Sequence, residues 1–205
     1  NQLLFFRVMQ KYTINCLSLI SRAVLTLAYS IASTSLAVGM EKPYPGSFFE
    51  NDELLMVVIP RTPEQMAAFY EARGFPQQAI DKVTATCFVT VHIDNKSRHI
   101  TWLETSNWRL TSQGNTLDIL DREYWGATWE EIDLPQAFRS TFYWTQLPSV
   151  VDLHPDEPVG GNIVLPGNTE RFAIEANFRT GADKQGEPLQ VRFSNIECGK
   201  TEVQP

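Results

Sequence analysis

The sequence predicts a mainly β fold, an antiparallel β-sandwich preceded by a short pair of helices. From Cys87 onward, short segments rich in β-branched and aromatic residues alternate with clusters of turn-forming residues. No long helical patterns separate these segments, so a parallel sheet built from strand–helix–strand units is not expected. Two cysteines, Cys87 and Cys198, lie near the two ends of this strand-rich region. We therefore expect residues 87–200 to form one sandwich domain, with residues 61–86 as a helical pair packed on it.

The first 37 residues predict a secretory signal peptide. They contain three basic residues and no Asp or Glu, and an apolar run extends from Ala23 to Ala32. A small-x-small pattern at Ser35 and Ala37 follows this run, which is shorter than the about 20 residues of a bilayer span. We expect cleavage after Ala37, with an uncleaved anchor as the alternative. The protein is therefore expected to be secreted or periplasmic, in the cell envelope.

The acidic charge of the chain excludes some classes of partner. The whole sequence has 17 basic and 24 acidic side chains, a net charge of −7. Without residues 1–37 it keeps 14 basic and all 24 acidic side chains, a net charge of −10. An acidic protein gains nothing from the counterion release that drives nucleic-acid binding, so we expect no nucleic-acid partner. We also expect no transmembrane span after signal cleavage.

Residues 38–60 are expected to be an extended lead-in, with the apolar run Leu54–Ile59 as a short strand or buried segment. The first helix of the pair is predicted to start at Thr62. Thr62 can cap the helix and Gln65 can complete a capping box, while Gly74 is a typical helix terminator. A second helix is expected to follow, with Pro76 near its start.

The first helix carries one candidate contact surface. Phe69, Tyr70 and Arg73 fall on one side of it at helical spacing. The simpler interpretation is that this side packs on the end of the sandwich. The alternative interpretation is that these residues form a surface for a partner.

Residues 87–104 predict a β-hairpin that turns at Asp94–Ser97. In its register His92 faces His99, which places their Cβ atoms about 5 Å apart. Two imidazoles at that distance can share a copper or zinc ion, although two ligands are too few for a complete site. The alternative is a pair of exposed strand histidines near a hairpin tip.

The rest of the chain predicts further strands around one interruption. Residues 121–138 form an acidic and aromatic excursion that contains Trp125 and Trp129. Flat aromatic rings stack on sugars, and paired carboxylates serve glycosidases, so these residues are a candidate ligand or partner surface. The alternative is an aromatic core loop with surface carboxylates. The strands expected after the excursion are Phe138–Leu147, Asn162–Leu165, Arg171–Phe178 and Leu189–Ile196.

Cys87 and Cys198 are predicted to form a disulfide, because an exported protein enters an oxidising compartment. The enclosed loop exceeds 100 residues. In the chain-entropy model such a crosslink is worth about 4–5 kcal/mol. The alternative is two buried free thiols.

Two turns carry a resemblance to a known group of domains. The Asn95–Ser97 turn lies between two strands, and the sequence from Pro155 to Gly161 leads into Asn162–Leu165. This arrangement is similar to exported bacterial immunoglobulin-like domains of unknown function, over about residues 87–198. The resemblance implies an immunoglobulin-like antiparallel β-sandwich. It implies no catalytic residue, because the shared motifs are turns.

No motif of a known catalytic class is present. The sequence lacks a Gly-rich phosphate loop, a His-Glu-x-x-His helix and a Gly-x-Ser-x-Gly elbow. We therefore expect no enzymatic activity and no cofactor. The leading hypothesis is an exported structural or partner-binding module whose partner is another envelope or extracellular protein. The alternatives are a copper- or zinc-binding periplasmic protein and a carbohydrate-binding protein.

Overall fold

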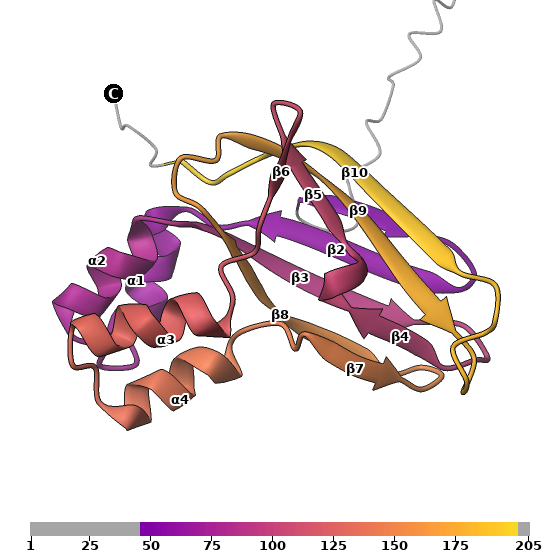
Figure 1. The fold of residues 1–205 in the computed structure, drawn as a ribbon, viewed down its shortest axis with the longest axis horizontal. Helices are drawn as coiled ribbons and strands as arrows, with labels where there is room; N and C mark the ends of the chain where they lie inside the picture. Colours follow the sequence, from indigo (N-terminus) through magenta and orange to yellow (C-terminus); the bar gives the residue numbers. More distant parts are fainter. Residues whose placement is uncertain (1–45, 201–205) are drawn as a thin grey trace, which may run out of the picture. The chain divides into compact units, whose positions relative to one another are not determined.

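The computed structural model describes residues 46–200, which form a mainly β structure with antiparallel strands in two sheets (Figure 1). This confirms the prediction of a mainly β fold with antiparallel sheets. The expected signal peptide lies outside these residues. The first sheet has the order β1-β2-β3-β8: Ser47–Glu50, Leu54–Pro60, Cys87–Asn95 and Pro158–Leu165. In the second, β10 pairs with β9 and the remaining order is β6-β5-β9-β4-β7. Its strands are β4 (Thr101–Glu104), β5 (Arg109–Ser112), β6 (Asn115–Leu117), β7 (Val150–Leu153), β9 (Arg171–Thr180) and β10 (Leu189–Glu197).

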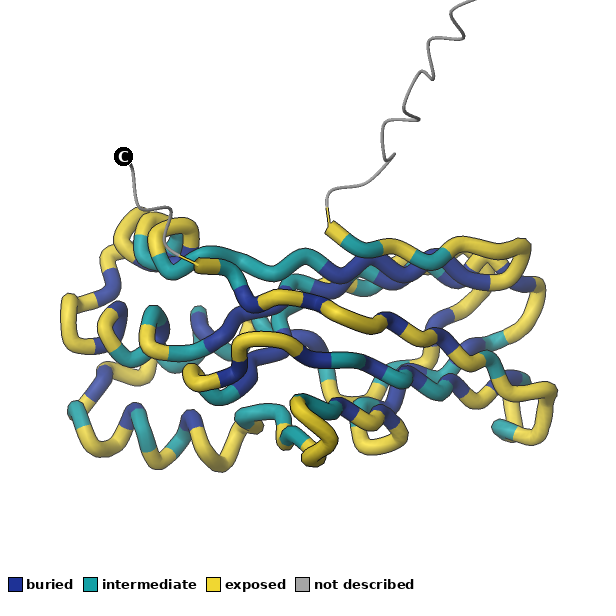
Figure 2. Tube along the Cα trace, turned by 90° about the horizontal axis from the view of Figure 1, so that it is seen from above, coloured by how far each residue is buried: buried dark blue, intermediate teal, exposed yellow. Residues whose placement is uncertain are grey.

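An apolar core lies between the two sheets. Successive residues of a strand point to opposite faces, so Val89, Val91 and Ile93 of β3 all face this core and are fully buried. Buried positions recur along the strands in the same alternating way (Figure 2). Strand β9 contributes the facing set Phe172, Ile174, Ala176 and Phe178.

The segment expected to be a lead-in is an integral part of the first sheet. Strand β2 pairs with β1 on one side and with β3 on the other, from Leu54↔Asn95 to Pro60↔Val89. Its first five residues are all buried, as expected for an interior strand. The sandwich therefore begins before residue 61, and the boundary predicted at Cys87 is too late.

Two helices, α1 (Pro63–Glu71) and α2 (Gln77–Thr84), connect β2 to β3. The start of α1 has the capping box that the sequence predicts. The Gln65 backbone N–H donates to Thr62 Oγ1 at 3.3 Å, and the Thr62 backbone N–H donates to Gln65 Oε1 at 3.2 Å. These helices do not precede the sandwich, because two strands come before them.

Two further helices occupy the segment predicted as an excursion and a strand. They are α3 (Arg122–Glu131) and α4 (Gln136–Trp144). Asp121 caps α3, since its Oδ1 accepts the backbone N–H groups of Glu123 and Tyr124 at 3.0 Å each. The aromatic residues lie one helical turn apart, at Trp125 and Trp129 on α3 and at Phe138 and Phe142 on α4. The strand predicted from Phe138 to Leu147 was wrong because helical packing overrode the β propensity of these aromatics.

All four helices contribute to a second apolar cluster, together with one end of the first sheet. Phe88 and Val164 belong to this cluster, whereas Val89 and Ile163 belong to the sandwich core. The helices gather at one end of the sheets (Figure 1), and the outer face of the first sheet packs against them there through Phe88 and Val164. None of the helices within residues 46–200 is long and apolar enough to cross a membrane. The cluster consists of Met66, Tyr70, Phe75, Ala79, Ile80, Val83, Phe88, Trp125, Trp129, Leu134, Phe142 and Val164.

The hairpin predicted for residues 87–104 does not form. Strand β3 pairs with β2 and β8, whereas β4 pairs with β7 and β9 of the other sheet. The chain crosses between the sheets at Asn95, whose side chain is fully buried. Its Nδ2 donates to the backbone oxygens of His99 at 2.7 Å and of Leu153 at 2.8 Å. A buried amide with these partners fixes a crossover where the sequence suggested a solvent-exposed turn.

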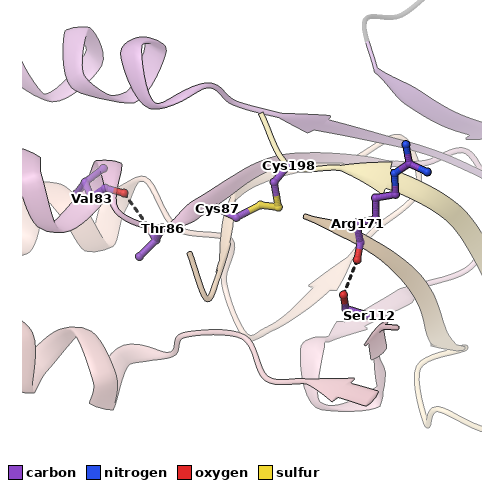
Figure 3. Close-up of a disulfide and its surroundings, with 6 residues drawn as sticks. All are labelled: Val83, Thr86, Cys87, Ser112, Arg171 and Cys198. Atoms are coloured by element: carbon purple, nitrogen blue, oxygen red, sulfur yellow. Dashed lines mark hydrogen bonds between the residues drawn. A yellow bond between two sulfur atoms is a disulfide. The ribbon is translucent and has the colours of Figure 1, made fainter. Parts of the chain in front are cut away.

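The predicted disulfide between Cys87 and Cys198 is present (Figure 3). The two Cα atoms are 5.7 Å apart and the cysteines are 111 positions apart in the sequence. Cys87 begins β3 of the first sheet, and Cys198 directly follows β10 of the second. The bond therefore joins the two sheets at the end where the helices pack.

Candidate functional site

A groove lies where the helical cluster meets the sandwich. Its volume is about 680 Å³. The start of α3, the end of α4, the connection from α4 to β7 and the edge of β8 supply its walls. The lining residues are Thr105, Ile119, Leu120, Asp121, Arg122, Trp125, Ser140, Tyr143, Trp144, Gln146, Leu147, Pro148, Ser149, Val150, Gly160, Asn162, Ile163 and Val164.

Trp144 is the most exposed large hydrophobic side chain within residues 46–200, at 89% exposure. It is the last residue of α4, a helix whose Phe142 points inward and is fully buried. Val150, at the start of β7, also lines the groove and is 58% exposed. Large exposed apolar groups beside a concave site are typical of binding surfaces.

Arg122 is the basic residue of the groove, and the Tyr143 ring lies beside it. The Arg122 guanidinium carbon lies 4.1 Å from the centre of the Tyr143 ring, a cation–π contact between α3 and α4. The neighbouring Asp121 carboxylate is engaged in capping α3. No ion pair within residues 46–200 involves Arg122. The guanidinium is therefore oriented by an aromatic ring and can still bind an anionic group of a ligand.

A hydrogen-bond network holds the inner wall of the groove in place. Asn162 Nδ2 donates to the Thr145 backbone oxygen at 2.9 Å, and its Oδ1 accepts from Thr90 Oγ1 at 2.8 Å. Thr90 Oγ1 in turn accepts from Arg61 Nε at 2.9 Å. The Thr145 hydroxyl is 2.8 Å from the Tyr70 hydroxyl. These bonds tie β3, β8 and α1 to the end of α4.

Trp125 closes the back of the groove and is only 1% exposed. It stacks on Trp129 with ring centres 4.8 Å apart. The Nε1 atoms of both rings are buried and have no acceptor within residues 46–200. Trp129 is fully buried in the core of the helical layer and does not line the groove, so it is no part of a ligand surface. Trp125 belongs to the same core and reaches the groove only at its back.

The predicted partner surface on α1 is divided by burial. Tyr70 is fully buried and bonds Thr145, so it is a core residue. Phe69 is half-buried. The exposed Arg73 lies over the Phe69 ring at 3.4 Å, and its Nη1 donates to the Phe69 backbone oxygen at 2.7 Å. Phe69 and Arg73 lie on α1 and do not line the groove.

His92 and His99 are not cross-strand neighbours. His92 pairs with Val57 of β2 and Gly160 of β8, whereas His99 is exposed beyond the end of β3. The register that brought the two imidazoles together is therefore wrong. Within the described part of the chain, no three His, Cys, Asp or Glu side chains are grouped as a metal site would require.

A second polar cluster lies away from the groove, around Glu104. Lys184 Nζ donates to its Oε1 at 2.9 Å, and Arg179 Nε donates to its Oε2 at 2.8 Å. The hydrogen bond from Lys184, followed by that from Arg179, lowers the pKa of the Glu104 carboxyl. Lys184 also lies over the Trp102 ring at 4.1 Å. The cluster ties β4 to the end of β9 and to the loop that follows it.

Sequence reasoning did not single out Arg122 or the connection from α4 to β7. Tyr143 and Trp144 were placed only within the predicted strand Phe138–Leu147. The helical spacing of Phe138 and Phe142 would have indicated the exposed position of Trp144, because these two residues define the buried side of α4 and Trp144 lies outside it. The acidic cap at Asp121 marks the start of α3 in the same way.

Comparisons with known proteins give no family. No family model matches the chain, and no curated protein matches it. Two solved structures from Bacillus subtilis are similar in part. The YjhA protein matches at a TM-score of 0.37 and 7% identity, over 65% of this chain and 78% of that one. The candidate lipoprotein YcdA, from strain 168, matches at a TM-score of 0.39 and 10% identity, over 74% of this chain and 39% of that one.

Proposed function

We propose that this protein is an exported binding module without catalytic activity, and that it binds another envelope or extracellular protein through the groove. The observation that carries the proposal is Trp144, an almost fully exposed tryptophan on the rim of a preformed groove. Exposing a tryptophan has no benefit for folding, whereas tryptophan is among the residues that contribute most to protein interfaces.

The surroundings of Trp144 support a fixed binding site. The network from Tyr70 through Thr145 to Asn162 braces the end of α4, so the ring is presented by an ordered element. Preorganisation of this kind reduces the entropy lost on binding. Export is proposed from the signal-like residues 1–37 and is supported by the disulfide between Cys87 and Cys198, a bond typical of oxidising compartments. We also propose that the two sheets form an immunoglobulin-like sandwich.

Site-specific photocrosslinking tests the proposal. A benzophenone-bearing amino acid replaces Trp144 in one variant and Tyr124 in the control. Tyr124 is another exposed aromatic of the helical layer, at 45% exposure, but it does not line the groove. We expect a discrete protein adduct in intact cells from position 144 alone. The partner protein identified from this adduct is then purified. It should bind the wild-type chain at least about tenfold more tightly than it binds the Trp144→Ala variant.

Adducts at both positions, or at neither, would contradict the proposal. So would a purified partner that binds the wild type and Trp144→Ala equally. Circular dichroism and thermal unfolding establish that each variant folds.

A carbohydrate-binding function is the second candidate, because Trp144 offers an exposed flat ring next to the amide of Gln146. Aromatic rings stack on the apolar faces of sugars. Soluble cell-wall saccharides test it: quenching or a blue shift of Trp144 fluorescence that disappears in Trp144→Ala would favour this candidate over a protein partner.

A further inference from the structure

The edge of β8 that faces away from β3 is paired at Asn162 and unpaired at Gly160. The Asn162 backbone N–H donates to the Thr145 oxygen at 2.9 Å, and its backbone oxygen accepts from the Leu147 N–H at 2.9 Å. Asn162 therefore directs its backbone groups away from β3. Alternate residues of a strand direct these groups to the same side, so Gly160 also points its N–H and C=O away from β3. Within residues 46–200, no strand pairs with β8 on this side at Gly160, and no backbone hydrogen bond outside the ladders reaches it.

The edge of β7 has the same property where it lines the groove. The Thr105 N–H donates to the Ser149 backbone oxygen at 2.9 Å, which sets the alternation of the β4–β7 ladder. Val150 therefore directs its N–H and C=O away from β4. Gly160 and Val150 both line the groove. The groove thus offers strand-edge backbone groups as well as exposed apolar side chains.

We infer that the occupant of the groove is an extended polypeptide segment, which adds as a strand to the open edge of β8 at Gly160. This inference rests on the proposed function and names the form of the partner. An open strand edge is a template for another chain in extended conformation. Gly160 is exposed, so its outward N–H and C=O are accessible to a second backbone.

Arg122 specifies the chemistry of that segment. It is the one basic side chain of the groove, and the Tyr143 ring orients it. A guanidinium donates two parallel hydrogen bonds to a carboxylate. Side chains alternate along an extended segment. The segment therefore carries an Asp, Glu or terminal carboxylate for Arg122 and an apolar side chain for Trp144 and Val150.

A matched pair of variants at Gly160 isolates the backbone contact. Gly160→Pro removes the outward N–H, and proline is tolerated on an edge strand where that N–H makes no ladder bond. Gly160→Ala keeps the N–H, and its Cβ would meet nothing closer than the Val91 oxygen at 3.5 Å. Both variants are expected to fold, and thermal unfolding establishes this.

The probes are short random peptides displayed on phage and selected on the wild-type mature chain. Selected sequences are synthesised, and their affinities are measured by fluorescence anisotropy. We expect peptides with an acidic residue and alternating apolar residues. Their affinity should fall by about tenfold or more for Gly160→Pro and for Arg122→Gln, and stay within about twofold for Gly160→Ala. Backbone N-methylation of the peptide at the pairing residue should cause a similar loss, and this measurement needs only the wild-type protein.

Three outcomes would overturn the inference: no groove-dependent peptides, equal binding to the Pro and Ala variants, or indifference to N-methylation at every position. A protein that crosslinks at residue 144 yet fails these peptide tests would leave the proposed function standing and remove strand addition. Loss of both the crosslink and the peptides would remove both proposals.

Discussion

The hydroxyl groups of Tyr70 and Thr145 lie 2.8 Å apart, and this contact joins α1 to the end of α4. The Thr145 hydroxyl donates to the Phe142 backbone oxygen at 2.7 Å, so Tyr70 is the donor to Thr145. Tyr70 is fully buried in the aromatic cluster, where its ring stacks on Phe142 at 5.8 Å between centres. The contact couples the core of the helical layer to the residue directly after Trp144.

Tyr70→Phe should therefore destabilise the protein. The substitution keeps the ring and removes one buried hydrogen bond, so the free energy of unfolding should fall by about 1 kcal/mol. Urea unfolding measures the change. Tyr124→Phe is the control, because Tyr124 is an exposed residue and the substitution should change the free energy of unfolding by less than about 0.5 kcal/mol. An equal loss from both variants would show that the Tyr70–Thr145 hydrogen bond does not stabilise the protein more than an exposed tyrosine hydroxyl does.

Tyr70 also predicts a dependence of stability on alkaline pH. Burial, the largest influence, raises the pKa of Tyr70 to about 12. The unfolded chain ionises this tyrosine near pH 10. The folded state then binds more protons than the unfolded state between about pH 10 and 12, so the stabilisation is complete below pH 10 and is lost across this window. The loss, on the order of 2 kcal/mol, should be smaller in Tyr70→Phe when urea unfolding is repeated across that pH range.

The parts of the fold that sequence predicted are those determined by local chemistry. Thr62 and Gln65 form the capping box of α1 because cap residues act within one turn of the chain. Cys87 and Cys198 pair as predicted because only two cysteines follow the signal-like segment. Helix α4 was missed because Phe138 and Phe142 suit a strand as well as a helix. The helix is favoured by contacts of the Phe142 ring with Tyr70 and Trp125, which are distant in the sequence.

The groove could not be predicted because no local pattern contains it. Arg122 and Tyr143 meet only when α3 and α4 pack, and Gly160, from another part of the chain, lines the same groove. The proposed histidine pair failed for a related reason. Its geometry required a hairpin, whereas burial of the Asn95 amide directs the chain from one sheet to the other.

Asn95→Ala should strongly destabilise the sandwich. Its Oδ1 accepts from the Ser97 hydroxyl at 2.7 Å and the Thr101 hydroxyl at 3.1 Å, in addition to the two bonds donated by its Nδ2. Removing the amide leaves several buried groups unsatisfied, so the free energy of unfolding should fall by about 3 kcal/mol or more. Asn51→Ala is the control. Asn51 also accepts two backbone N–H groups, but in an exposed turn, so its loss should be about 1 kcal/mol or less. Chemical denaturation of both variants compares the two amides.

The disulfide should contribute strongly to stability. A crosslink between positions 111 apart restricts the unfolded chain and is worth about 4–5 kcal/mol in the chain-entropy model. The double variant Cys87→Ala with Cys198→Ala should show this loss in urea unfolding under oxidising conditions. Reductant should destabilise the wild type but leave the double variant unchanged. Equal urea midpoints for the two proteins without reductant would contradict a stabilising bond.

Gly160 and Gly161 are adjacent, yet their substitution by alanine should affect the free energy of unfolding very differently. A Cβ on Gly161 would lie 2.4 Å from the Leu147 backbone nitrogen, and backbone atoms cannot yield as a flexible side chain can. Gly161→Ala must therefore displace the connection between α4 and β7, and should lower the free energy of unfolding by about 2 kcal/mol or more. It should also weaken binding in the groove, because Leu147 and Pro148 form part of its wall. Gly160→Ala makes only ordinary contacts and should stay within about 0.5 kcal/mol of the wild type. Thermal unfolding of the two variants side by side checks this, and similar values for both would show that the connection from α4 to β7 does not pack closely on β8.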